Sequence, residues 1–390
     1  MPDFSNLPVV DHHCHPYDPE QAFLEPISLA RVFLHGFCDI PKTDPSLKPR
    51  YWDASKELND HFPHMGVVQT LVCRLSGLFG CPADLASVAQ ERNRRTGDSF
   101  RDYIRMLYED ARLVGTVLDT GLPAGDPLLD LIPPRRLRLF QMDPAIPELA
   151  ALSGSYRDYI DAYGQRLEKA VHRDGFVGVK VHLAERVGLG AEPVPDAEME
   201  RVFPEVKTGN AEAGKKLYVA TFAATLLRCR DLGVPVHIHT GFTGGLWNGP
   251  ISGADPFLLA PLLSRKEFLN TRVVLLHAGY PWTKQAGQLA HTLPHVWVDM
   301  SQMTPWASLC LAECYRDVMA WAPWSKIVVG SGGHGTPEIA WLAAKTAKIA
   351  LSTVFTEAVS SGLVTEKQAA SAARMILHDN AARLYGLASQ

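Results

Sequence analysis

The chain has 390 residues, of which 46% are hydrophobic and 21% are charged, an ordinary globular composition. A formal net charge of −4 without a long Lys/Arg cluster argues against a nucleic-acid-binding surface. We find neither a signal-peptide pattern nor an apolar run of about 18 residues, so we expect no membrane span and a soluble, cytoplasmic protein.

Short apolar runs alternate with longer amphipathic runs, a rhythm typical of parallel strands joined by helices. Eight strands are expected, the number that closes a (β/α)8 barrel. We therefore predict an α/β protein, a (β/α)8 TIM barrel that forms a single domain over residues 1–390. The expected strands are Leu7–Asp11, Leu113–Asp119, Leu137–Gln141, Val177–His182, Val234–His239, Arg272–His277, His295–Asp299 and Lys326–Gly330.

A mostly helical insertion of about residues 16–111 is expected between the first two strands. At that place it would lie above the barrel mouth, as a lid or as the contact of a homo-oligomer, with a packing extension as the alternative. Its expected helices are Glu25–Leu34, Ser55–Leu78, Asp84–Arg95 and Ser99–Tyr108. Later helices are expected at Tyr156–Arg173, Glu212–Leu232, Pro256–Leu263, Trp306–Trp321, Pro337–Ser360 and Glu366–Leu377.

The first expected strand ends in a histidine-rich segment, Asp11–Pro16. Side chains alternate along a strand, so Asp11, His13 and His15 are expected on one face. Two imidazoles at i and i+2 can converge on one divalent ion, because neutral imidazole is a good ligand for zinc and related metals. A His-x-His pair also occurs by chance, so its position at a strand end is what favours a metal site.

Two further expected strands also end in histidine. We expect His239 to be a metal ligand and His237 to be a core histidine, because only the later residue reaches the mouth. A third strand ends at His277. Strand ends in a barrel lie on one ring, so His277 and His239 can meet the histidines of the first strand there.

Two other polar residues stand out near strand ends. Lys180 lies inside an apolar strand, which is unfavourable unless its ammonium group is paired or modified. It could be carbamylated and bridge two metals, bind an anionic substrate group, or extend to the barrel mouth. His334 follows the last strand and faces the mouth if that strand ends near Gly330; a loop histidine is the alternative.

These segments together resemble the amidohydrolase-related family. The resemblance is closest to the branch that contains the N-terminal domain of fungal FluG proteins and the γ-glutamylamide hydrolases, and it extends over about residues 7–388. It is carried by Asp11–Pro16, Val236–Phe242, Leu276–Pro281, Ser331–Glu338 and the tail Ile376–Leu387.

The resemblance implies a divalent metal on His13, His15 and His239, with His277 as a further ligand or a catalytic histidine. Zinc is the first expectation by ligand type, with manganese and iron as alternatives. The resemblance also implies a catalytic aspartate after the last strand, but Gly332 stands at that position. The chain could be an inactivated variant, a natural enzyme that uses His277 or His334 as its base, or a binding protein.

The resemblance further implies metal-dependent hydrolysis of an amide bond. We expect Lys180 and Arg186 to hold a substrate carboxylate, which points to a γ-glutamyl-type amide; His334 and Glu338 are also expected on the substrate side. The alternatives are a metal-dependent non-oxidative decarboxylase, with His277 as the proton donor, and a metal-free binding protein on the same barrel.

Overall fold

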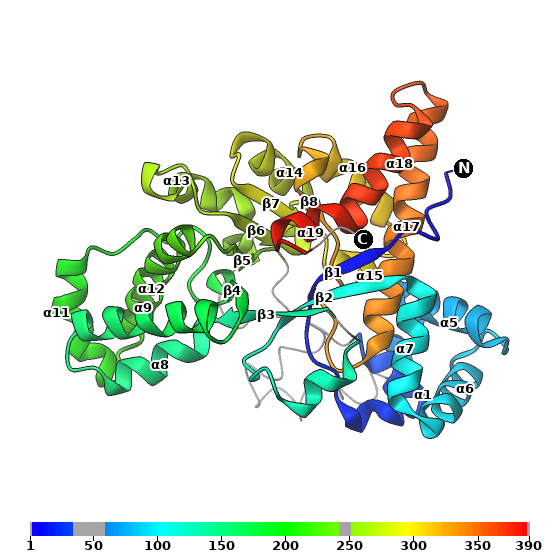
Figure 1. The fold of residues 1–390 in the computed structure, drawn as a ribbon, viewed down its shortest axis with the longest axis horizontal. Coiled ribbons are helices and arrows are strands. Elements are labelled where there is room, and N and C mark those ends of the chain that lie inside the picture. Colours follow the sequence, from blue (N-terminus) through cyan, green and yellow to red (C-terminus); the bar gives the residue numbers. More distant parts are fainter. Residues whose placement is uncertain (1, 34–58, 134, 242–250, 388–390) are drawn as a thin grey trace.

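The computed structural model describes residues 2–33, 59–133, 135–241 and 251–387. Eight parallel strands form one sheet in sequence order (Figure 1), so the predicted barrel is confirmed. The strands are β1 (Val9–Cys14), β2 (Leu113–Asp119), β3 (Arg136–Gln141), β4 (Phe176–Val181), β5 (Val236–His239), β6 (Val273–Leu276), β7 (Val296–Asp299) and β8 (Ile327–Val328).

The segment after β8 closes the sheet against β1. The backbone N–H of His12 donates to the carbonyl of Val329 at 2.8 Å, and the N–H of Gly332 donates to the carbonyl of His13 at 2.7 Å. A Cβ atom at Gly330 would lie 2.9 Å from the backbone nitrogen of His13, so this close approach requires glycine.

Strand β1 does not keep the simple alternation expected from its sequence. Its pairing with β2 shifts register between Asp11 and Cys14. The ring of His12 stacks on that of His237 in β5, four strands away, so it points into the barrel. The ring of His13 lies 5.4 Å from that of His277, just beyond β6. Because an irregular pairing rotates the side chains that follow it, neighbouring histidines of β1 both reach the interior.

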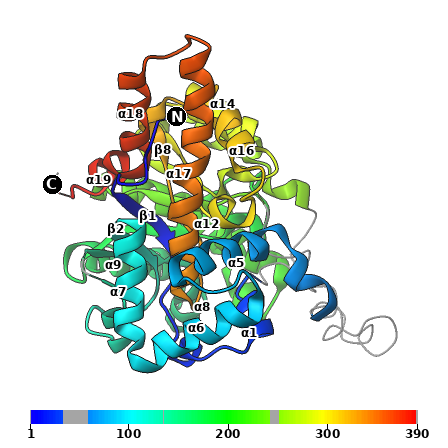
Figure 2. The ribbon, with the colours of Figure 1, turned by 90° about the vertical axis from the view of Figure 1, so that its right-hand side faces the viewer.

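The described part of the insertion contains α1 (Pro26–Arg31), α5 (Gly66–Phe79), α6 (Leu85–Asp98) and α7 (Phe100–Ala111). Helices α5 and α7 pack against α17 (Pro337–Ser360) on the outside of the barrel, as Figures 1 and 2 show. Within the expected helix Ser55–Leu78, residues 59–61 are helical, a short 3-10 helix follows at Phe62–His64, and α5 begins at Gly66; the first four residues of the expected helix lie outside the described residues, as does Leu34. The lid and the subunit contact stay predictions.

Helix α17 agrees with the expected bounds, whereas the expected helix Trp306–Trp321 is divided by a turn. Five helices were missed: α8 and α11 contain internal prolines, α10 and α19 have only four and five residues, and the sequence of α14 is polar and contains glycine. The remaining helices are α8 (Met142–Leu152), α9 (Tyr156–His172), α10 (Leu183–Arg186), α11 (Asp196–Lys207), α12 (Ala211–Leu232), α13 (Ala260–Leu263), α14 (Thr283–Thr292), α15 (Met303–Trp306), α16 (Leu311–Met319), α18 (Glu366–Arg374) and α19 (Asn380–Leu384).

Two hydrophobic clusters hold the barrel together. The larger fills the layer between the strands and the outer helices. The smaller joins Val10, Val274 and Val328 of the strands to Leu384 of α19, with Tyr385 packed against it. Each fully buried aliphatic side chain contributes about 1.5–3 kcal/mol, so α19 is anchored firmly against the strands. Among the described residues, no helix is long and apolar enough to cross a membrane.

Candidate metal centre

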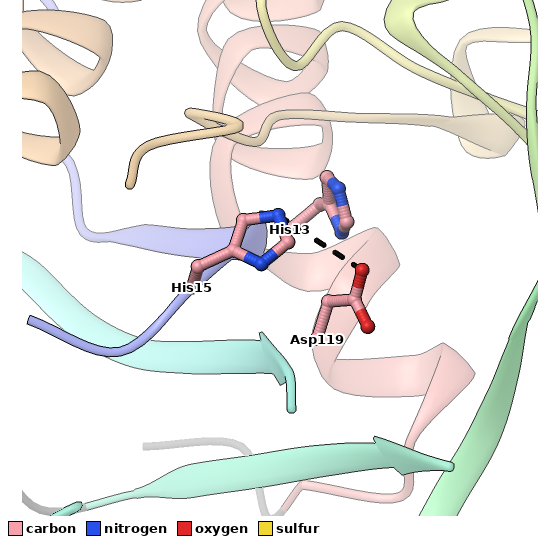
Figure 3. A group of neighbouring side chains, drawn as sticks. All are labelled: His13, His15 and Asp119. Carbon is pink, nitrogen blue, oxygen red and sulfur yellow. Dashed lines mark ion pairs between the residues drawn. The ribbon is translucent and has the colours of Figure 1, made fainter. Parts of the chain in front are cut away.

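The ends of β1 and β2 bring together two imidazoles and one carboxylate. His13, His15 and Asp119 each offer a ligand atom, and these three atoms all lie within 4.8 Å of one another. Figure 3 shows the three side chains turned toward a common point, with His15 Nε2 3.9 Å from Asp119 Oδ2. His13 and Asp119 are buried and His15 is half-buried, so an ion held there would be shielded from bulk water.

The electrostatics of this group suit a divalent cation. Burial, and then the charge of Lys180, hold the pKa of His13 well below its usual value, so the ring is neutral and can act as a ligand. Its Nδ1 atom is buried and has no hydrogen-bond partner among the described residues. Burial alone would raise the pKa of Asp119, but Lys180, His15 and His182 lower it, so the carboxylate is ionised. The residues present therefore fit a metal ion.

Asp119 is held in place by residues of β3 and β4. Lys180 Nζ lies 3.2 Å from Asp119 Oδ2, and Gln141 Nε2 donates to Asp119 Oδ1 at 2.9 Å. Lys180 Nζ also lies 2.7 Å from His182 Nε2. The lysine that stood out in the apolar strand is thus buried and paired with a carboxylate, which satisfies its charge.

His239 and His277 lie beside this group. The ring centres of His277 and His13 are 5.4 Å apart, and those of His277 and His239 are 4.4 Å apart. His239 Nε2 lies 3.7 Å from Glu185 Oε1. Among the described residues His239 is not part of the three-residue group, so its role as a ligand stays a proposal.

Arg186 stands at the rim of the site. Its side chain is 56% exposed, and its Nε donates to Asp143 Oδ1 at 3.2 Å. Asp143 also lies 3.2 Å from His182 Nδ1. Burial alone would raise the pKa of Asp143, but His182 and Arg186 lower it. A chain of polar contacts therefore connects Arg186, through Asp143 and His182, to Lys180.

The loop after β8 sends its residues in two directions. The ring of His334 stacks on that of His15 with centres 3.6 Å apart. Glu338 is fully buried, and its Oε1 accepts hydrogen bonds from Arg92 Nε at 2.5 Å and from Tyr103 OH at 2.8 Å. The structure thus brings His334 to the metal group, whereas Glu338 forms a buried ion pair with Arg92 of the insertion, and its substrate role stays a prediction.

Gly332 has a φ of +64°, in the left-handed region. A Cβ atom at this position would lie 2.7 Å from Cγ of Gln302, so a larger residue requires that side chain to move. Among non-glycine residues, aspartate and asparagine tolerate this φ best. The aspartate that the resemblance implies would therefore be strained here, although less than most other side chains, and it would also crowd the backbone nitrogen of Gln302.

A second group of histidines lies deeper in the barrel. His12 and His237 stack with ring centres 4.7 Å apart, and Tyr385 OH lies 2.7 Å from Nε2 of each ring. His12 Nδ1 lies 3.0 Å from Asp299 Oδ2. We call His12, His237, Tyr385 and Asp299 the axial group, and His13, His15, Asp119, His239 and His277 the mouth group.

Sequence reasoning missed several members of these groups. Asp119 ends an apolar strand just as the histidines do, so the same signal could have identified it. Asp299 ends β7 in the same way, and Ser301, whose hydroxyl group contacts it, follows two residues later. Asp143 lies in α8, a helix that was not predicted, and its position therefore carried no signal.

The chain is similar to known proteins in sequence and in fold. Residues 133–387 match the profile of the amidohydrolase family. Protein fluG of Emericella nidulans is 28% identical over 257 residues, which are 62% of this chain and 29% of fluG, so the chain spans less than a third of that curated relative.

Two solved structures share the fold over nearly the whole chain. One is a candidate metal-dependent hydrolase from Lactobacillus casei ATCC 334, 21% identical, with a TM-score of 0.81 and coverage of 99% of this chain and 98% of that one. The other is the glucuronate isomerase of Caulobacter crescentus, 15% identical, with a TM-score of 0.69 and coverage of 99% and 92%. At these identities the likeness supports the fold and not the substrate.

Proposed function

Because the chain belongs to the amidohydrolase family of metal-dependent hydrolases and related enzymes, we propose that it hydrolyses an amide bond with a divalent metal ion. The proposal is carried by the ligand atoms of His13, His15 and Asp119, which lie within 4.8 Å of one another at the barrel mouth. Active sites of this fold lie at that end of the strands.

Two imidazoles and one carboxylate would hold the metal and leave positions open for water and substrate. Catalytic zinc sites use such sets, and iron and manganese also accept them, so zinc remains the first candidate. A bound divalent cation would supply Lewis acidity, which polarises a carbonyl group and makes water a stronger acid. His239, next to His277, is proposed as a further ligand.

The proton of the attacking water needs an acceptor, and no carboxylate stands at Gly332. We assign this role to His277, whose Nδ1 lies 2.8 Å from Ser301 Oγ and whose ring adjoins His13. General acid–base catalysis by a positioned histidine contributes about 10²–10⁴-fold. His334, stacked on His15, is the alternative acceptor.

The substrate is proposed to carry a carboxylate, as a γ-glutamyl-type amide does. Arg186 stands exposed at the rim, and the buried Lys180, whose ammonium group is paired with Asp119, is connected to it through His182 and Asp143. The guanidinium group of Arg186 is partly exposed and keeps nitrogen atoms for a second carboxylate, which its planar fork can bind with two hydrogen bonds.

The test is an assay of the metal-loaded protein with a panel of γ-glutamyl amides, in which the released amine is measured. Asp119→Asn should abolish amine release, and Asp98→Asn, a change at an exposed helix position, should leave it unchanged. Release of carbon dioxide from an aromatic acid would favour the decarboxylase instead. Because a similar fold belongs to a glucuronate isomerase, a uronate serves as a further competing substrate.

A protein that binds these compounds tightly but holds no metal and turns none over would be a binding protein. Elemental analysis of the purified protein decides this point directly. The sequence of the source gene at codon 332 decides separately whether glycine is natural or introduced.

A further inference from the structure

A continuous set of buried polar contacts joins the tail of the chain to His277 at the mouth. Asp299 lies in the middle of this set, fully buried at the end of β7. Its Oδ1 atom accepts hydrogen bonds from the backbone N–H of Ser301 at 2.9 Å and from the Ser301 hydroxyl group. The same hydroxyl oxygen lies 2.8 Å from His277 Nδ1.

The other carboxylate oxygen of Asp299 faces the axial group. His12 Nδ1 lies 3.0 Å from Asp299 Oδ2, and His12 Nε2 lies 2.7 Å from Tyr385 OH. Tyr385 belongs to the tail Ile376–Leu387, which follows the last barrel strand by almost fifty residues and returns to pack against the strands. Tyr385 OH also contacts His237 Nε2 at 2.7 Å, so the tail holds both axial rings.

The donors and acceptors around Ser301 allow only one arrangement. A carboxylate accepts hydrogen bonds and donates none, so the single hydroxyl hydrogen of Ser301 points to Asp299. The Ser301 oxygen can then only accept a hydrogen bond from His277, which requires a hydrogen on Nδ1. In a neutral imidazole the lone pair is then on Nε2.

We propose that Asp299 and Ser301 fix the hydrogen of His277 on Nδ1, and that Tyr385 and His12 hold Asp299 in the position that this requires. All four are positioning residues, because they act on the reaction through His277. The tautomer follows from the contacts alone; only its use, as the nitrogen that accepts a proton from water, rests on the proposed function.

The arrangement gives a role to two features that the metal centre leaves unexplained. His12 lies next to a proposed ligand in sequence, yet its ring points to the axis, where it contacts Asp299 and Tyr385. The tail motif lies far along the chain from every ligand, yet it supplies the hydroxyl group that orients His12. Outer partners of this kind commonly set the tautomer and the angle of a functional histidine.

The experiment is a ¹⁵N–¹H correlation spectrum of the full-length protein labelled at histidine nitrogen. The His277 signals are assigned by their loss in His277→Gln. We expect the wild-type ratio of Nδ1–H to Nε2–H at His277 to exceed about tenfold, since one buried hydrogen bond decides between the tautomers. In Ser301→Ala, which removes the acceptor, this ratio should fall to about one.

Two tyrosine variants test the contribution of the tail. Tyr385→Phe removes only the hydroxyl group that contacts His12, and we expect a change in the His12 signals with a smaller fall of the ratio at His277. Tyr163→Phe is the matched control, because Tyr163 is buried and its hydroxyl group contacts Thr225 of α12, which lies outside this set of contacts. It should change neither set of signals.

A wild-type spectrum with the hydrogen on Nε2 of His277 would overturn the proposal, as would an unchanged ratio in folded Ser301→Ala. An unchanged ratio of the two tautomers at His277 in Tyr385→Phe would show that Tyr385 has no part in fixing the tautomer, while the roles of Asp299 and Ser301 would stand. If the proposed hydrolysis is correct, Ser301→Ala also lowers kcat by about 10²-fold at constant KM and metal content. If hydrolysis is absent from every variant, the proposed function fails while the tautomer result stands.

Discussion

The barrel contains two groups of histidines that look alike in sequence and differ in their surroundings. In the axial group, His12 and His237 share contacts with the hydroxyl group of Tyr385, and His12 also contacts Asp299. In the mouth group, two imidazoles and the carboxylate of Asp119 bring their ligand atoms within 4.8 Å of one another. Only the second arrangement offers a cation several ligands at once.

The difference teaches that a histidine near the end of a barrel strand is not identified as a ligand by its position alone. His12 and His13 are adjacent in sequence and both are buried, yet one ring contacts a tyrosine and the other keeps a buried Nδ1 without a partner among the described residues. Two features separate them. His12 faces Asp299 and both of its ring nitrogens have a hydrogen-bond partner, whereas His13 faces Asp119 and its Nδ1 has none among the described residues.

The largest expected effect comes from removing histidines in pairs from each group. His13→Ala with His15→Ala should weaken metal binding by more than about 10⁴-fold, because zinc sites bind with about 10–16 kcal/mol shared among about four ligands. His12→Ala with His237→Ala, the matched pair from the axial group, should lower stability and leave the metal bound. Titration calorimetry of the folded proteins measures both. Equal losses of metal affinity in the two double variants would contradict the distinction between the mouth group and the axial group.

A smaller effect tests whether Glu338 belongs to the mouth or to the scaffold. Glu338→Gln keeps the shape of the side chain but leaves the charge of Arg92 buried without a counter-ion, so the free energy of unfolding should fall by about 3–5 kcal/mol. Metal binding should not change. Glu357→Gln, which affects an exposed pair with Arg316, should cost less than about 1 kcal/mol in urea unfolding. A stable Glu338→Gln variant with altered substrate binding would support the expected substrate role.

Gly332→Asp tests whether a carboxylate at this position adds to the proton acceptor that His277 supplies. Because His277 already fills this role, we expect turnover of a γ-glutamyl amide to rise, but by less than the full factor of about 10² that a general base usually contributes. Because the new Cβ atom would crowd Gln302, Gly332→Asp is compared with the double variant that also carries Gln302→Gly. Gly332→Ala controls for the change in backbone freedom. No gain in turnover with the metal still bound would contradict this part of the mechanism.

The smallest expected effect is on the pH dependence of the free energy of unfolding, to which one histidine of each group contributes. Burial holds the pKa of His13 and of His237 well below the usual 6.5. Below pH 6.5 these two rings therefore bind protons in the unfolded chain but stay neutral in the folded chain. The free energy of unfolding should therefore fall as the pH drops below 6.5, by up to about 1.4 kcal/mol per pH unit for each ring. In metal-free protein, His237→Gln should reduce this slope by the contribution of one ring, up to about 1.4 kcal/mol per pH unit. Urea titrations between pH 6.5 and 5.5 measure the slope. An unchanged slope would show that His237 is not held neutral by burial.

The sequence predicted the barrel well because eight apolar runs at regular intervals leave few alternatives. It also predicted that the histidines of β1, β5 and β6 gather at one end. It could not predict that β1 is irregular, since the register shift between Asp11 and Cys14 depends on its pairing with β2. For the same reason, the alternation rule puts His12 and His13 on opposite faces, whereas both rings reach the interior.

Asp119 shows a different limit. The strand that contains it was predicted with its correct bounds, but a terminal aspartate is common at strand ends, and only its closeness to His13 and His15 marks it as a ligand. The roles of Glu338 and Tyr385 depend on contacts with residues more than a hundred positions away, which no local pattern encodes.

The most direct test of the account is a crystal structure of the protein loaded with zinc, with diffraction data recorded on both sides of the zinc absorption edge. We predict one anomalous peak at about 2.0–2.2 Å from a nitrogen of His13, a nitrogen of His15 and an oxygen of Asp119. A peak bound to the axial histidines, or a mouth without a peak in zinc-saturated crystals, would contradict the central claim.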